Sequence, residues 1–200
     1  MVLETEIRQP LTLADFEAFI DLPENSERTF EFISGEIVEV PSNPFVSEIA
    51  GLIMFFIRLF LVQNNIAGHL TGEAGGYMVN GERYAPDVAF ISYARQPELA
   101  RSGYNPNPPE LAVEVISDPA SIEEQSALRR KLANYLAAGT LVWIVDPSTR
   151  MVEVYPPGQP AQTVGEGGAL SGGAVLPGLS IPVKDIFPAS GPKPETASAG

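Results

Sequence analysis

The sequence predicts an α/β domain with a mixed β-sheet flanked by helices. Three observations favour this class: strand-like runs occur in pairs around turn residues, three helical segments separate them, and a single strand precedes the last helix. The resulting order is helix, hairpin, helix, hairpin, strand, helix, hairpin. A doubly wound parallel sheet requires regular strand–helix alternation, so we expect a mixed sheet with β-hairpins near both ends of the chain.

The first two elements are a short helix and a hairpin. Residues 12–20 are typical of a helix whose N-cap is Thr12 and whose first turn is acidic. Residues 28–40 contain two extended runs on either side of Ser34 and Gly35. Because this dipeptide suits a tight turn, the segment predicts an N-terminal β-hairpin.

A long apolar helix is predicted over residues 45–64. Its continuous apolar part, residues 49–62, includes Arg58 and is shorter than the roughly 20 residues that a membrane span needs. The first residues also lack the basic region of a secretory signal. We therefore expect a buried core helix in a soluble, cytoplasmic protein.

A second strand pair is predicted over residues 70–79 and 83–92. The two runs flank Asn80 and Gly81, the strongest short hairpin signal in the chain. A polar loop with four prolines, residues 93–109, follows them. The prolines make further regular structure there unfavourable.

The next unit is a strand, a helix and a second strand. The apolar run at residues 110–117 predicts the first strand. Ser121 and Glu124 match the capping box that starts a helix, and Gly139 suits the position after its end. Residues 141–146 are almost entirely apolar and predict a buried strand.

The C-terminal part predicts a hairpin and then irregular structure. Residues 151–155 pair with the preceding strand, and residues 156–182 are rich in Gly and Pro, with short apolar pieces that we expect to close the sheet edge. Residues 189–200 are small and polar and predict a disordered tail. Residues 1–188 are therefore expected to form a single domain.

Composition excludes several kinds of site. The chain has no cysteine, so disulfides, thiolate zinc sites and cysteine nucleophiles are excluded, and its single histidine, His69, excludes a histidine-rich metal site. The net charge is −13, from 25 acidic and 12 basic residues. This charge repels nucleic acid at long range and argues against nonspecific DNA coating, but a nuclease needs local acidity to hold metal.

Two acids and one lysine carry the functional signal. Asp87 and Glu114 each lie within an apolar strand-like run, where a charge is costly unless it is paired or binds metal. Lys131 is the only lysine in the first 183 residues. Sequential strands are usually neighbours, so the two carboxylates can converge, and a hard divalent cation such as Mg²⁺ would relieve their repulsion.

The position of Lys131 on its helix leaves two interpretations open. At about 100° per residue, Lys131 borders the buried stripe beside Tyr135, whereas Arg129 occupies the opposite border. The helical wheel therefore does not single out the lysine. It either reaches a functional site or extends its ammonium from a packed helix into solvent.

Five motifs in order resemble the Uma-two family of restriction-endonuclease-like proteins, within the PD-(D/E)XK nuclease superfamily. They are TFEFISGEIV at residues 29–38, YAPDVAF at 84–90, LAVEVIS at 111–117, KLANYLAAG at 131–139 and VWIVDP at 142–147. The resemblance spans roughly residues 10–187. It implies a restriction-endonuclease-like fold and a DNA endonuclease activity that hydrolyses phosphodiester bonds.

The resemblance also implies roles for individual residues. Asp87 matches the family's metal-binding aspartate and Glu114 its second acid. The superfamily's usual lysine two residues after that acid is replaced by Ile116, and Lys131 on the following helix takes its place. Asp87 and Glu114 would hold Mg²⁺, with Mn²⁺ as a substitute, and Lys131 would orient the attacking water or stabilise developing negative charge.

Other acids rank lower. Glu73, in the predicted strand before Asp87, is a second-tier candidate for the metal shell, although a solvated strand residue is the simpler interpretation. Glu31 and Glu48 are interpreted as surface or capping residues.

A non-catalytic binding or assembly module with a nuclease fold is the alternative function. The acidic net charge, the displaced lysine and the replacement of the family's helix-start histidine near Val46 favour it. Hydrolysis of a phosphodiester other than DNA is a third, weaker hypothesis. A homodimer is a further expectation, since cutting both DNA strands often uses two sites.

Overall fold

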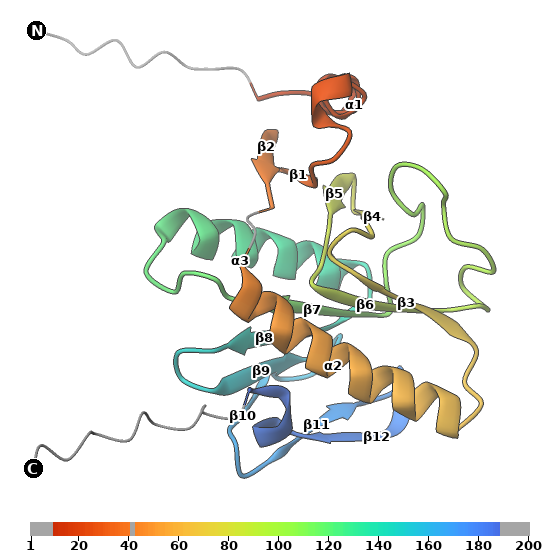
Figure 1. Cartoon of the computed structure of the whole chain (residues 1–200), viewed down its shortest axis with the longest axis vertical. Helices are drawn as coiled ribbons and strands as arrows, with labels where there is room; N and C mark the ends of the chain where they lie inside the picture. Colours follow the sequence, from red (N-terminus) through yellow and green to blue (C-terminus); the bar gives the residue numbers. More distant parts are fainter. Residues whose placement is uncertain (1–9, 41–42, 189–200) are drawn as a thin grey trace, which may run out of the picture.

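The computed structural model describes residues 10–40 and 43–188. These residues form three β-sheets with three α-helices around them (Figure 1). This mixed α/β architecture is the predicted class. The tail predicted at residues 189–200 lies outside the described residues.

The largest sheet has six strands in the order β10-β9-β8-β7-β6-β3. Strands β7 and β8 pair in parallel and every other neighbouring pair is antiparallel, so the sheet is mixed, as predicted. The strands are β3 (Gly68–Gly72), β6 (Val88–Ser92), β7 (Leu111–Val115), β8 (Leu141–Asp146), β9 (Met151–Tyr155) and β10 (Gln162–Val164).

A four-stranded antiparallel sheet in the order β2-β1-β5-β4 lies beside it. Both of its hairpins turn at a dipeptide with positive φ, Ser34-Gly35 (55° and 81°) and Asn80-Gly81 (48° and 86°), as the type I′ turn requires. Its strands are β1 (Phe30–Ile33), β2 (Glu36–Glu39), β4 (Tyr77–Val79) and β5 (Glu82–Tyr84).

The predicted strand pair 70–79 and 83–92 is wrong in extent, because each run is divided between the two sheets. Only the parts next to the turn pair as β4 and β5, while β3 and β6 pair in the large sheet. Pro86 has no amide proton to continue a ladder, and Gly76 approaches the ring of Tyr104 so closely that a Cβ would lie 2.2 Å from it. Asp87 consequently lies just before β6 and not within a strand.

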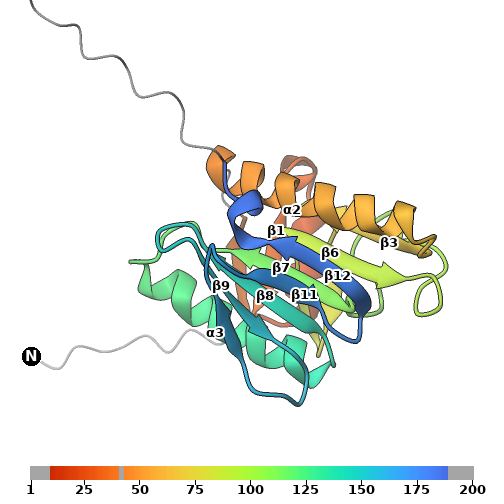
Figure 2. The same ribbon diagram turned by 90° about the horizontal axis from the view of Figure 1, so that it is seen from below.

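Two helices cover opposite faces of the large sheet (Figure 2). Helix α2 (Pro44–Gln63) packs against β3, β6, β7 and the C-terminal strand β12 (Leu176–Pro182), and α3 (Ile122–Ala137) packs against β8 and β1. The remaining elements are α1 (Leu13–Ile20), the hairpin β11 (Ala169–Gly172) and β12 (Leu176–Pro182), and the 3₁₀ turns η1 (Pro23–Asn25) and η2 (Val183–Ile186).

The alternation of side chains along the strands divides the core into two layers. Val88, Val113 and Trp143 belong to the layer on the α2 side. Ala89 and Ala112 belong to the layer on the α3 side, together with buried residues of α3 itself. Since side chains alternate along a strand, Glu114 points to the α3 side.

Helix α2 is longer than the apolar run that predicted it and is only partly buried. By length and composition it passes the test for a membrane span, with a mean hydropathy of 2.2, but core helices of soluble proteins pass the same test. One face, which includes Ile49, Ile53 and Ile57, is fully buried against the sheet. The opposite face is exposed. The helix that was predicted to be buried is therefore buried on one face only.

The ends of α3 are fixed largely as predicted. Ser121 Oγ accepts a hydrogen bond from the amide of Glu124 (3.2 Å), and Gly139 has a φ of 79°, as a residue after a helix end often does. The Glu124 carboxylate does not complete the capping box. It accepts instead from the amides of Ser117 (2.7 Å) and Asp118 (2.9 Å), which ties α3 to the end of β7.

Candidate active site

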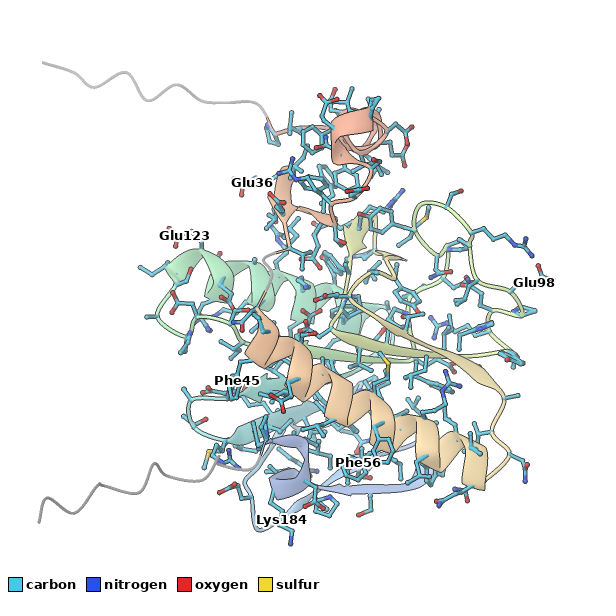
Figure 3. All side chains as sticks on the ribbon, viewed as in Figure 1. Glu36, Phe45, Phe56, Glu98, Glu123 and Lys184 are labelled. Atoms are coloured by element: carbon cyan, nitrogen blue, oxygen red, sulfur yellow. The ribbon has the colours of Figure 1, made fainter. Side chains whose placement is uncertain are left out.

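A pocket with a cavity volume of about 740 Å³ lies between the β1–β2 hairpin, the end of β7 and α3. Figure 3 labels two residues of its lining, Glu36 on β2 and Glu123 on α3. Its charged lining is mostly acidic. The basic residues are Arg130 and Lys131, and the acidic ones are Glu31, Glu36, Glu39, Glu73, Asp87, Glu114, Glu123 and Glu124. An anionic substrate therefore needs additional positive charge to enter.

Asp87 and Glu114 converge where the start of β6 and the end of β7 reach this pocket. Strands β6 and β7 pair with Val88 opposite Val113, which places Asp87 across from Glu114. Asp87 Oδ2 accepts a hydrogen bond from the amide of Val115 at 2.7 Å. The segment in which the chain crosses from β5 to β6 thus places Asp87 next to Glu114.

Lys131 meets the acids from α3. Its Nζ donates to Glu114 Oε2 at 2.6 Å and to Glu31 Oε1 at 2.8 Å. The lysine is only 6% exposed, so the interpretation in which its ammonium extends into solvent is wrong. Tyr135, one turn further along α3, donates its hydroxyl to Glu114 Oε1 at 3.0 Å.

Glu31 is buried, so its interpretation as a surface or capping residue is wrong. It is 6% exposed, and its Oε1 accepts from the amide of Ala85 (2.7 Å) as well as from Lys131. The face of β1 that carries Glu31 and Ile33 turns toward α3, whereas Phe30 and Phe32 pack in a separate cluster near α1. An acid in a strand with apolar residues on both faces was the available signal, and it is the same pattern that identified Glu114.

The two remaining candidate acids, Glu73 and Glu48, are exposed. Glu73 is exposed in the turn after β3, so its predicted place within a strand is wrong, although it lines the pocket. Glu48 is exposed on α2, in agreement with its interpretation as a surface residue.

Burial changes the pKa values of these groups. Burial raises the pKa of Asp87 to about 6, although the Val115 amide and Lys131 act in the opposite direction. Burial likewise raises the pKa of Glu114, and the charges of Glu31 and Asp87 add to the effect. For Lys131, burial alone would lower the pKa, but the attraction of Glu114 and Glu31 outweighs it and raises the pKa.

The cluster of Glu31, Asp87, Glu114 and Lys131, in which Asp87 is half-buried and the other three are buried, is not neutral. Three carboxylates against one ammonium leave two negative charges uncompensated when all are ionised. Uncompensated buried charge is costly, so the cluster must either take up protons or bind a cation. A divalent cation would supply two positive charges.

The donor set fits a hard cation such as Mg²⁺ that keeps several of its waters. Among residues 10–40 and 43–188, no three acidic or histidine side chains form a ready-made metal cluster. Mg²⁺ commonly uses one or two carboxylates and keeps several waters. Asp87 and Glu114 satisfy that requirement, and in the described part of the chain Asp87 Oδ1 has no hydrogen-bond partner.

Comparisons with known proteins agree with this architecture. The family model Uma2, described as "Putative restriction endonuclease", matches residues 16–184. Among solved structures, one described as a "putative nuclease" from Anabaena variabilis is similar, with a TM-score of 0.75 and 23% sequence identity. The match covers 89% of this chain and 98% of that chain. A search of the curated proteins found no match.

Proposed function

Because the chain belongs to the Uma2 family of restriction-endonuclease-like proteins, we propose that it is a Mg²⁺-dependent endonuclease that hydrolyses phosphodiester bonds in DNA. The observation that carries the proposal is the buried excess of negative charge next to a lysine in an open pocket. A structural ion pair needs one carboxylate for its ammonium, whereas this site has three.

Asp87 and Glu114 would hold the metal, and Mn²⁺ would substitute for Mg²⁺ because both prefer oxygen ligands. When bound, the metal supplies a Lewis acid for the phosphoryl oxygen and acidifies a water ligand. Glu73, at the pocket lining, is the candidate for a contact through water. Its exposure makes it the least constrained of the three acids.

Lys131 would act on the phosphate. An ammonium has three donors, and two of them bond with Glu31 and Glu114. Within the described residues, one donor is left for a water or a phosphate oxygen. The two carboxylates orient the ammonium, and its positive charge would stabilise the charge that develops in the transition state.

Plasmid cleavage in the presence of Mg²⁺ tests the proposal. The wild-type protein should nick or cut DNA, and Asp87→Asn should abolish cleavage, since the amide keeps the acceptor for Val115 but loses the charge. Lys131→Met should reduce cleavage by about 10²–10³-fold. Glu153→Gln, an exposed acid on β9, is the matched control and should cleave normally. Unchanged cleavage by Asp87→Asn would refute the proposal.

A second candidate function is a binding or assembly module without catalysis. It is favoured by the internal bonding of the site, because both oxygens of Glu114 already accept hydrogen bonds from Lys131 and Tyr135. Calorimetry separates the two functions. Heat of binding for Mg²⁺ or Mn²⁺ that disappears in Asp87→Asn supports the nuclease, whereas a folded protein that binds neither cation supports the module.

A further inference from the structure

The outward face of α2 carries a seam that is apolar except for Glu48. We define the seam as Phe45, Glu48, Leu52, Phe55, Leu59 and Val62, which are spaced alternately by three and four residues. Phe55 is 58% and Val62 66% exposed. This spacing is the heptad pattern by which one helix packs against another. Large exposed apolar patches on a protein surface commonly mark a site of interaction.

The seam is distinct from the face that α2 uses in its own fold. Val46, Ile49, Ile53 and Ile57 pack on the large sheet and leave the seam on the opposite side. Figure 2 shows α2 along the edge of the molecule, and no described element covers its outer side. Figure 3 labels Phe45 near the start of the helix and Phe56 further along it.

We propose that α2 pairs with α2 of a second copy of this chain, antiparallel and about a twofold axis. When the axis passes between Ile53 and Met54, the seam maps onto itself. Each seam residue then meets a seam residue of the partner, in the pairs 45 with 62, 48 with 59 and 52 with 55. A self-complementary patch of this kind is what a twofold interface requires.

The charges on α2 favour the same antiparallel arrangement. Glu48 and Arg58 are its only charged residues, and both are exposed. In the antiparallel pair, Arg58 lies beside Glu48 of the partner subunit, and symmetry repeats the contact. A parallel pair would instead place two copies of Glu48 against each other, and like charges at that position are destabilising.

A membrane surface fits this face less well than a second copy. Helices that lie on membranes are rich in Lys and Arg on their polar face. Helix α2 has one arginine, and the chain has a net charge of −13, which repels anionic lipids. A second copy supplies both the apolar seam and the opposite charges.

The dimer would place the two pockets at opposite ends of the paired helices. Val46, in the first turns of α2, lines the pocket. With a rise of 1.5 Å per residue, the two copies of Val46 would lie roughly 22 Å apart along the helix axis. This pairing of two chains does not depend on catalysis.

Sedimentation equilibrium of the full chain at micromolar concentrations tests the pairing. The wild-type protein should have the mass of two chains. Phe55→Glu should raise the dissociation constant by about a hundredfold or more, because it buries unpaired charge in the interface. Ser47→Glu, an exposed position of α2 outside the seam, adds the same charge and should change the constant less than about twofold.

A charge swap tests the antiparallel register. Glu48→Arg alone should weaken association by about tenfold, and Glu48→Arg combined with Arg58→Glu should restore it. A wild-type mass of one chain at all concentrations would overturn the proposal. So would a dimer that Phe55→Glu leaves intact, or a monomer whose binding to phosphatidylglycerol vesicles is lost in Phe55→Glu, since the latter identifies a membrane as the occupant.

Discussion

Lys131 links three parts of the chain that are distant in sequence. It lies on α3 and binds Glu114 on β7 and Glu31 on β1, and each contact is shielded from solvent. Because the ammonium is held from two sides, its position in the pocket is fixed before any substrate arrives. Such preorganisation is what transition-state stabilisation by a charged group requires.

Replacing the lysine should show how far the fold depends on this contact. In Lys131→Met, Glu31 and Glu114 lose their shared cation while they stay buried, and the free energy of unfolding should fall by about 3–5 kcal/mol. Urea denaturation measures the change. Arg129→Met, an exposed neighbour on the same helix, should change stability by less than about 0.5 kcal/mol. A loss below about 1 kcal/mol for Lys131→Met would contradict the buried triad.

Asp87 should destabilise the metal-free protein at neutral pH. Its pKa rises from 3.8 to about 6 on folding, so stability is lost as pH rises through the window between these values. Asp87→Asn keeps the acceptor and removes the charge. In EDTA at pH 7.5 it should therefore unfold at higher urea, with a gain of about 1–3 kcal/mol.

The pH dependence of that gain is the sharper test. At pH 5 the native carboxyl is mostly protonated, and the advantage of Asp87→Asn should shrink by about 1 kcal/mol. A gain that is equal at both pH values would show that Asp87 does not titrate as described.

Among single residues, the sequence singled out Asp87, Glu114 and Lys131, which the structure brings into one pocket, but it missed Glu31. Asp87 and Glu114 stood out because a charge interrupts an apolar run. Glu31 has the same surroundings, but alternation with Phe30 and Phe32 suggested an apolar face and a solvent face. In the structure both faces of β1 are covered, one by the aromatic cluster near α1 and the other by the core layer under α3. The covering of the second face depends on tertiary packing, which the local sequence pattern does not reveal.

At the level of elements, α3 carries the lysine and its N-terminal cap fixes its start. Ser121 accepts from the Glu124 amide, and the Glu124 carboxylate holds the amides of Ser117 and Asp118. The cap therefore connects the helix to β7, which carries Glu114. This link holds the start of α3 near the end of the strand that carries Glu114.

Removing the cap should loosen the first turn of α3. Ser121→Ala should lower the free energy of unfolding by about 1 kcal/mol, because one amide at the helix start loses its acceptor. Hydrogen exchange should be faster at the amide of Glu124 than in the wild type. Ser126→Ala, at an exposed position of the same helix, is the control. Equal protection in both variants would argue against the cap.

Elements with local signals were predicted well, and the division between sheets was not. Strands β8 and β9 have the predicted bounds, and the turns at Ser34-Gly35 and Asn80-Gly81 were visible as dipeptides. The break before Asp87 was missed. Whether a chain stays in one sheet or crosses to another depends on long-range pairing, and the Tyr104 ring that crowds Gly76 is distant in sequence.

At the scale of the whole molecule, the chain and its pocket carry charge of the same sign. The chain carries a net charge of −13, and its pocket is also mostly acidic. The proposed DNA substrate would therefore be repelled from the pocket until a cation binds. Catalysis and substrate binding should both depend on the metal, and added salt should reduce this repulsion.

Metal binding should release protons. At pH 6, part of Asp87 and of the buried Glu114 is protonated, so a divalent cation must displace protons to reach both carboxylates. The affinity for Mg²⁺ should consequently rise between pH 6 and pH 8. Calorimetry at one pH in buffers of different ionisation enthalpy should give different apparent heats of binding. Identical heats would contradict proton release.

Crystals soaked in Mn²⁺ provide the most direct test of a cation site between Asp87 and Glu114. The anomalous difference map of the wild-type protein should contain a strong peak in contact with both carboxylates, and the same map for Asp87→Asn should lack it. A pocket without a peak, in crystals where Mn²⁺ binds elsewhere on the molecule, would contradict the metal-dependent site.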